Sequence, residues 1–353
     1  RQMCIRDRCI FMPSDLTAGI EFNQDKLEDN MWGYHRTVDQ KVNIGSAFLQ
    51  NEWKNDHWGF LIGGRLDKHN LIDHVIFSPR ANLRYNPTEN INLRFSYSSG
   101  FRAPQAFDED LHVENVGGNV AMVELADNLK EERSQSLSAS ADIYHRFGAF
   151  QVNFLVEGFY TKLSDVFALT DGEVVDGILT RTRHNASGAQ VMGLTLEGKM
   201  AYLNKIQVQA GVTLQQSHYS EPHIWNKEAP AVKKMMRTPN TYGYFTATYT
   251  PIKPLSIALS GTYTGSMLVP HEPVPGFLEN PITVNTKDFF DIGLKAAYDF
   301  KLYKSMNFQV NAGIQNIFNA YQNDFDKGAD RDSGYIYGPS LPRSFFAGVK
   351  ISY

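Results

Sequence analysis

Histidine, tryptophan and methionine side chains gather in one polar stretch of the second half of the chain. They are His218, His223, Trp225, Met235 and Met236. Aromatic and methionine side chains can grip a bulky macrocyclic or chelated ligand, and histidine can bind a metal ion. The spacing fixes no metal geometry, so ordinary packing of a loop is an equally good interpretation. Within this stretch, His223, Trp225, Met235 and Met236 are our candidates for ligand binding.

Four aspartates crowd a second polar stretch near the C-terminus. They are Asp324, Asp326, Asp330 and Asp332. Carboxylates around a glycine could supply oxygen ligands to calcium. The spacing is not that of an EF-hand, however, and Lys327 and Arg331 neutralise part of the charge. A solvated surface loop is the favoured interpretation, and we expect no other cofactor.

Catalytic chemistry finds little support in this sequence. No Ser-His-Asp or Cys-His arrangement can be placed on a common face, so we do not expect an enzyme. The two cysteines, Cys4 and Cys9, lie in an N-terminal tail that shows neither strand alternation nor an apolar signal region. We interpret residues 1–13 as non-native or disordered and residues 14–353 as one unit. The net charge of −4 gives no reason to invoke nucleic acid.

Strand-like alternation runs through the rest of the chain. In residues 290–300 every second side chain is apolar or aromatic, and those between are mostly small or charged. Because a strand points successive side chains to opposite faces, such a segment has one apolar and one polar face. Fourteen segments can be read as strands. They are 16–22, 42–53, 58–67, 77–85, 91–98, 137–144, 152–160, 180–202, 206–215, 243–249, 255–264, 290–300, 308–315 and 345–353.

The connections between these segments alternate in length, with six tight turns on one side and seven long loops on the other. Any one segment could be a half-buried strand of a soluble sheet, but a soluble sheet has no reason to keep its long loops at one end. Outer-membrane barrels have short periplasmic turns and longer extracellular loops. No window approaches 18 uncharged apolar residues, which excludes transmembrane helices. The sequence therefore predicts an all-β, antiparallel transmembrane β-barrel.

Several short motifs resemble the barrel of TonB-dependent receptors, the active transporters of Gram-negative outer membranes. They are Phe48–Trp53, Gly64–Asp67, Ser78–Tyr85, Tyr97–Pro104, Leu129–Ser134, Gly313–Phe318 and Gly338–Phe346, with Asn185 and Gly193 in the long strand. The loop 323–338 is similar to that of Bacteroidetes members. Each motif is loose by itself, but their order and spacing make the combination specific.

The resemblance implies a plugged barrel of about 22 strands, of which this chain supplies about fourteen C-terminal strands and no plug. It implies import of a ferric siderophore or a cobalamin-like corrinoid through the Gram-negative outer membrane. Its implied partners are the outer-membrane lipid, the ligand and the TonB complex, the last through the missing plug. A surface lipoprotein is a further candidate partner. The alternatives are a complete passive fourteen-stranded channel for hydrophobic or sugar solutes, and an outer-membrane lipase.

The resemblance also suggests site residues in the wall and at the C-terminus. Charged side chains on the predicted lumen face would contact the plug or line the transport route, namely Arg65, Arg94, Arg102, Glu197 and Lys295. Solvated wall charges that neutralise one another are the alternative interpretation, which applies least to Arg102 because it leaves a strand into the longest loop. Phe345 and the terminal Tyr353 would form the aromatic signature of barrel assembly.

Overall fold

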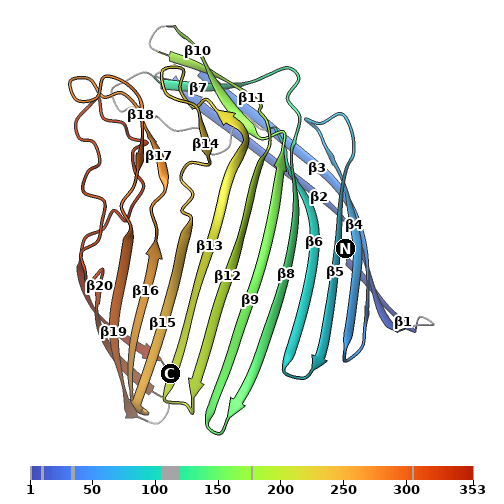
Figure 1. Ribbon diagram of the computed structural model, residues 1–353, viewed down its shortest axis with the longest axis vertical. Helices are drawn as coiled ribbons and strands as arrows, with labels where there is room; N and C mark the ends of the chain where they lie inside the picture. Colours follow the sequence, from blue (N-terminus) through green and yellow to red (C-terminus); the bar gives the residue numbers. More distant parts are fainter. Residues whose placement is uncertain are drawn as a thin grey trace.

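The computed structural model describes residues 2–8, 12–32, 36–104, 120–175, 178–303 and 306–352. One strongly curved, 16-stranded sheet forms a wall, in which strands that are consecutive along the wall pair antiparallel (Figure 1). Its order is β1-β2-β3-β4-β5-β6-β8-β9-β12-β13-β15-β16-β19-β20-β21, and β14 pairs with β13. No helix of the described residues is long and apolar enough to cross a membrane.

The wall strands follow the predicted segments closely. They are β1 (Gln2–Arg8), β2 (Pro13–Met31), β3 (Arg36–Lys54), β4 (Trp58–His69), β5 (Ile76–Thr88), β6 (Ile91–Arg102), β8 (Glu132–Phe147), β9 (Phe150–Ser164), β12 (Ala189–Tyr202), β13 (Ile206–His223), β14 (Val232–Lys234), β15 (Thr241–Ile252), β16 (Leu255–Thr264), β19 (Phe289–Tyr303), β20 (Met306–Gln315) and β21 (Ser344–Ser352). Thirteen of the fourteen predicted strands, and the second part of the one predicted over residues 180–202, are confirmed as neighbours in one antiparallel sheet.

The long connections lie together at one end of the wall, and the short turns lie at the other (Figure 1). Two small sheets occupy the long-loop end. One contains β7 (Val120–Leu125), β10 (Phe167–Val175) and β11 (Ile178–Asn185), and the other contains β17 (Leu268–His271) and β18 (Ile282–Asn285). The predicted asymmetry of the connections is therefore a property of the fold.

Strand register places the apolar positions on one common face. Residues paired across neighbouring strands point to the same side, and Trp53, Phe60, Leu83 and Phe95 form such a row. A second row contains Ala247, Leu259, Leu294, Ile314 and Phe345. We call this side the apolar face and the other side the polar face. Ile62 and Phe345 on the apolar face are 61% and 74% exposed, so large apolar side chains stand exposed along this face.

The single long strand predicted over residues 180–202 is wrong. The chain breaks at residues 186–188, where β11 leaves the wall and pairs with β10 and β7 while β12 stays in it. At the break the backbone of Gly188 lies against the carbonyl of Leu163, where a Cβ atom would clash. Alternation continues through both strands and so cannot show which sheet each one joins.

The predicted loop over residues 23–37 is also largely strand. β2 and β3 continue to Met31 and from Arg36, and their pairing extends to these ends. Because both faces of this extension are mainly polar, its sequence has no hydrophobic alternation that would predict a strand. Other predicted loops contain the short strands β7, β14, β17 and β18.

The two ends of the wall differ from a closed barrel. β1 pairs with β2 along residues 2–8, within the tail that we predict to be non-native or disordered. The origin of residues 1–13 stays a prediction. Within the described residues β1 and β21 end the order of the sheet and are not paired with each other.

The compact packing of the molecule lies under the long loops, because a one-layer wall has no interior of its own. Met267, Val269 and Tyr335 form a buried cluster there, and Val269 is 0% exposed. Val284 and Tyr337 pack against it. The loop end is therefore the part of the described chain with a protein-like core.

Candidate functional site

A cleft of about 810 Å³ opens at the long-loop end. It lies between the small sheet of β10 and β11, the end of β13 and the loop that follows β13. Its lining includes three arginines and three aromatic or imidazole side chains, namely Arg102, Arg181, Arg183, Tyr219, His223 and Trp225. Glu221, Lys227, Met236 and Glu272 also line it.

The arginines reach the cleft from two different sheets. Arg181 and Arg183 lie two residues apart on β11, so alternation places both on one side of that strand. Arg102 lies at the end of wall strand β6. The guanidinium carbon of Arg102 lies 4.9 Å from the centroid of the Phe167 ring, and that of Arg183 lies 5.7 Å from it. Phe167 thus holds two cations against its ring by cation–π attraction.

The aromatic side chains of the cleft come from the end of β13 and from the loop that follows it. The rings of Tyr219 and His223 lie with their centroids 4.7 Å apart. Trp225 follows, and its Nε1–H is buried with no hydrogen-bond acceptor among the described protein atoms. Burial of an unpaired donor is costly, so this N–H is suited to donate to a ligand oxygen.

A network of polar contacts lies beside the arginines of the cleft. It is built around Glu131, Glu132 and Asn185, and we call it the junction. Arg102 Nε donates to Glu132 Oε2 at 2.6 Å, and the backbone N–H of Phe167 donates to Glu132 Oε1 at 2.9 Å. One carboxylate therefore positions both the cation and the ring beneath it. Glu132 lies in the segment Leu129–Ser134 and Arg102 in Tyr97–Pro104, so two of the motifs quoted from the sequence meet here.

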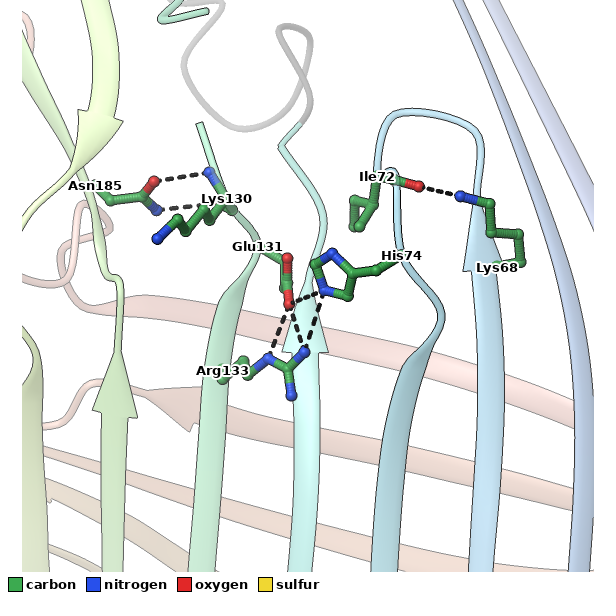
Figure 2. A network of polar contacts seen from close by, with 7 residues as sticks. All are labelled: Lys68, Ile72, His74, Lys130, Glu131, Arg133 and Asn185. Atoms are coloured by element: carbon green, nitrogen blue, oxygen red, sulfur yellow. Dashed lines mark hydrogen bonds and ion pairs between the residues drawn. The ribbon is translucent and has the colours of Figure 1, made fainter. Parts of the chain in front are cut away.

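Asn185 holds the same junction from β11. Its Oδ1 accepts the N–H of Lys130 at 2.7 Å, and its Nδ2 donates to the carbonyl of Lys130 at 3.0 Å (Figure 2). Nδ2 also donates to the carbonyl of Asp165 at 2.8 Å. The side chain fastens the strand that carries Arg181 and Arg183 to the segment that precedes β8.

Glu131 is the most buried charge of the junction, with its side chain 4% exposed. Arg133 Nε donates to Oε1 at 2.8 Å and His74 Nε2 lies 3.0 Å from the same oxygen (Figure 2). Burial by itself would raise the pKa of this carboxyl. The hydrogen bonds from its own backbone N–H, from Arg133 and from His74 outweigh burial and hold the pKa below its usual value.

The predicted wall residues share the polar face but are spread along the sheet. Arg65 Nη1 and Nε contact Glu21 at 2.9 Å and Asp67 at 2.7 Å. The other side chains of the set have these positions: Arg94 donates to Asn92 at 2.7 Å, Glu197 pairs with Lys199 at 2.6 Å, and Lys295 lies in register between Ala258 and Gly313. The cleft contains Arg102 but none of the other four. Their roles toward a plug stay predictions.

The predicted ligand loop is only partly assembled into the cleft. His223, Trp225 and Met236 line it, whereas the N–H of Met235 donates to the carbonyl of Ser217 at 3.2 Å. Our sequence analysis missed Arg181 and Arg183, because it placed them in a wall strand. A pair of arginines at i and i+2 beside a predicted loop is the signal that could have found them.

Three of the four aspartates proposed for calcium contact other groups of the protein. Asp324 accepts the Tyr337 hydroxyl at 2.7 Å, and Asp326 lies 2.9 Å from His271 Nε2. Asp332 accepts the N–H groups of Glu272 and Gly334 at 2.9 and 2.7 Å. Throughout the described part of the chain, no group of three or more His, Cys, Asp or Glu side chains is arranged to hold a metal ion. Calcium at Asp324, Asp326, Asp330 and Asp332 stays a prediction without support from this geometry.

Of the two residues predicted to form the assembly signature, the structure describes Phe345. Phe345 lies on β21 opposite Ile314, on the apolar face. Tyr353 lies outside the described residues.

Comparison with known proteins gives a family and a fold. The family model described as "TonB dependent receptor-like, beta-barrel" matches residues 12–317. No curated protein matches. Among solved structures, the siderophore receptor PirA from Acinetobacter baumannii is 17% identical with a TM-score of 0.70, over 100% of this chain and 54% of that one.

Two further solved structures show the same likeness. A ferric enterobactin receptor mutant from Pseudomonas aeruginosa, in complex with enterobactin, is 17% identical with a TM-score of 0.71, over 99% of this chain and 53% of that one. The FrpB iron transporter from Neisseria meningitidis is 16% identical with a TM-score of 0.67, over 99% and 54%. The chain thus spans about half the length of the structures that it matches.

Proposed function

Because this chain belongs to the TonB-dependent receptor β-barrel family, we propose that it forms the C-terminal part of a receptor that imports a chelated iron compound. The family comprises transporters and receptors of the Gram-negative outer membrane, and the chain is such an outer-membrane protein. The proposal treats the remaining strands and the plug as parts of the longer receptor.

The observation that carries the proposal is the arginine and aromatic lining of the cleft. Chelators that hold ferric iron through catecholate or carboxylate oxygens form anionic complexes, and catecholates present flat rings. Arginine offers a rigid fork of N–H donors to such oxygens and stacks on such rings. Arg181 and Arg183 on β11, with Trp225 and His223 across the cleft, would grip this kind of ligand.

The positive charge of this lining and the solved structures that resemble the chain favour an iron chelate over a corrinoid as the ligand. The similar structures are described as siderophore receptors and as an iron transporter. In the proposed mechanism the ligand is captured at the cleft, and the TonB complex then supplies energy through the plug to open the route past the wall. The arginine-rich lining supplies affinity for the chelate before this step.

Uptake measurements with the complete receptor test the transport proposal. The receptor would be expressed in a Gram-negative host that lacks its own ferric siderophore receptors, with and without TonB. We expect accumulation of radioactive iron from a chelate only when TonB is present. Iron entry that is equal without TonB would overturn active import, and uptake of cobalamin without uptake of iron would overturn the substrate class.

Binding measurements test the cleft. Arg181→Ala should weaken binding of a ferric chelate to the purified receptor by about tenfold, because a charge-assisted hydrogen bond is lost. Tryptophan fluorescence quenching would report the binding. Arg146→Ala, near the short-turn end of β8, is the matched control and should leave binding unchanged. An equal loss in both variants would contradict the proposed site.

The described structure gives no support to the alternative of a passive fourteen-stranded channel. A closed fourteen-stranded barrel needs β2 to pair with β21, whereas β2 pairs with β1 and β3, and β21 pairs with β20 within the described residues. No specific observation favours this second function.

A further inference from the structure

A hollow interrupts the apolar face about midway along the wall strands, just below the row where that face ends toward the long loops. It is a groove of about 890 Å³ over β8, β9, β12 and β13. Two neighbouring cross-strand rows line it. The lower row contains Phe95, Ala139, Gly158, Leu194 and Leu214, and the upper row contains Leu137, Tyr160, Met192 and Gln216.

The floor of the groove is made by the two smallest side chains of the lower row. Ala139 and Gly158 lie directly opposite each other on β8 and β9. A Cβ atom added at Gly158 would meet no atom within 4 Å, so this position is open space. Phe95 and Leu214, at the two sides, are 48% exposed each. A large apolar surface of this kind requires an apolar occupant.

The next row toward the loop end contains two lysines, and we call it the basic row. Register places Gln135, Lys162, Gln190, His218 and Lys234 side by side on β8, β9, β12, β13 and β14. Because strand pairs share a face, this row lies on the apolar side, directly beyond Leu137, Tyr160 and Met192. Lys162 is exposed. The wall thus carries positive charge where the apolar surface ends.

Polar contacts join this basic row to the groove. The Tyr160 hydroxyl donates to Gln190 Oε1 at 3.2 Å, and Gln190 Nε2 lies 2.6 Å from His218 Nε2. Arg133 lies in the following row, opposite Ser164, and is paired with Glu131 at 2.7 Å. Its charge is therefore partly neutralised, and Lys162 and Lys234 supply the net positive charge of the row.

We propose that this groove and the basic row above it form a binding site for a phosphorylated, acylated lipid of the outer leaflet. Long loops of outer-membrane barrels lie on the cell-surface side, so the groove faces the outer half of the bilayer. Acyl chains would fill the hollow over Ala139 and Gly158. The phosphate would lie between Lys162 and Lys234, which attract anionic headgroups at a membrane surface. The charge of the row selects this occupant over an uncharged lipid.

Native mass spectrometry of the complete receptor in detergent tests the site. The probes are lipid A with its two phosphates and the same lipid after dephosphorylation. We expect the phosphorylated lipid to be retained at least about tenfold more strongly. Lys162→Gln combined with Lys234→Gln should abolish this preference, whereas Lys253→Gln, in the short turn at the opposite end of the wall, should preserve it.

A second variant tests the groove separately from the charge. Gly158→Leu directs a side chain into the hollow from a position where a Cβ atom meets nothing within 4 Å, and it should reduce retention of both lipids severalfold. Unchanged binding of a ferric chelate by these variants would show that the receptor is folded. Equal retention of the two lipids by the unaltered receptor, or retention that is insensitive to either set of substitutions, would overturn the proposal.

Discussion

At the scale of single residues, the junction beside the cleft depends on two side chains that satisfy several groups at once. Asn185 pairs with both backbone groups of Lys130 and with the carbonyl of Asp165. Glu131 accepts from Arg133 and His74 while it is almost fully buried. Loss of one partner in such a network leaves the others buried and unpaired, which costs more than the bond itself contributed.

Glu131 predicts a pH dependence of this junction. Its pKa in the folded protein is lower than the ordinary value of 4.5, so the stabilisation is complete above that value. It is lost as the pH falls through the lower, folded-state pKa. We expect Glu131→Gln to lower the free energy of unfolding by about 1.5–3 kcal/mol at pH 7, and by less in strong acid.

Denaturant unfolding of the complete receptor at neutral and acidic pH measures this difference. Glu89→Gln, in the exposed turn between β5 and β6, is the control and should show no difference at either pH. A deficit of Glu131→Gln that grows on acidification would contradict the sign of the pKa shift.

At the scale of strands, aromatic rings on the polar face lie over glycines of the neighbouring strand. Register pairs Gly19 with Phe48, Gly193 with Phe159 and Gly211 with Tyr244. In each pair a Cβ atom on the glycine would collide with the ring. The rings therefore lie flat along the wall and cover the glycine backbone.

This packing predicts different tolerance at two glycines of β12. A Cβ atom at Gly193 would lie 2.6 Å from the Phe159 ring and 2.6 Å from the carbonyl oxygen of Leu214, whereas one at Gly198 would meet nothing within 4 Å. Gly193→Ala should cost about 1–3 kcal/mol through overpacking. Gly198→Ala should be neutral or slightly stabilising, since alanine loses less backbone entropy than glycine.

Unfolding of both variants in the same detergent provides the comparison. Equal stability of the two variants would show that the Phe159 ring can move aside freely. The interpretation that close glycine–ring packing stabilises the wall would then be wrong.

The assignment of the two faces predicts the response of neighbouring residues on β16. Leu259 lies in the apolar row with Ala247 and Leu294, and Ser260 points to the polar side. Leu259→Arg should cost about 2–4 kcal/mol if it lies near the bilayer midplane. Ser260→Arg should change stability by no more than about 0.5 kcal/mol. Unfolding of the receptor from phospholipid vesicles measures both, and equal costs would refute the face assignment.

At the scale of the whole molecule, stability is divided between a one-layer wall and an interlocked loop end. The wall satisfies its backbone groups by strand pairing, which lipid requires. At the loop end, Arg237 donates to the carbonyl of Ile336 at 2.8 Å, and the His271 ring stacks on Tyr335 at 3.7 Å between centroids. Burial raises the pKa of the Tyr335 hydroxyl, and nearby aspartates add to the shift. These contacts connect three loops into one cap beside the cleft.

The sequence by itself determined most of the wall strands, their two faces and the asymmetry of the loops. These properties are local: alternation at period two depends on neighbours along the chain, and tight turns depend on a few residues. The same patterns identified the family, and the family model confirms it. The sequence also identified Arg102, His223 and Trp225 as site candidates, because strand ends and polar loops show where a cleft can form.

Only the tertiary structure decided which segments meet. β11 continues the alternation of β12 but pairs with β10 and β7, which carries Arg181 and Arg183 out of the wall and into the cleft. Lys130 and Asn185 are 55 residues apart and meet because of that pairing. The lipid groove likewise exists because register sets Ala139 opposite Gly158 and Lys162 above them. Such pairings follow from the closure of backbone hydrogen bonds between distant strands, and no local pattern of side chains encodes them.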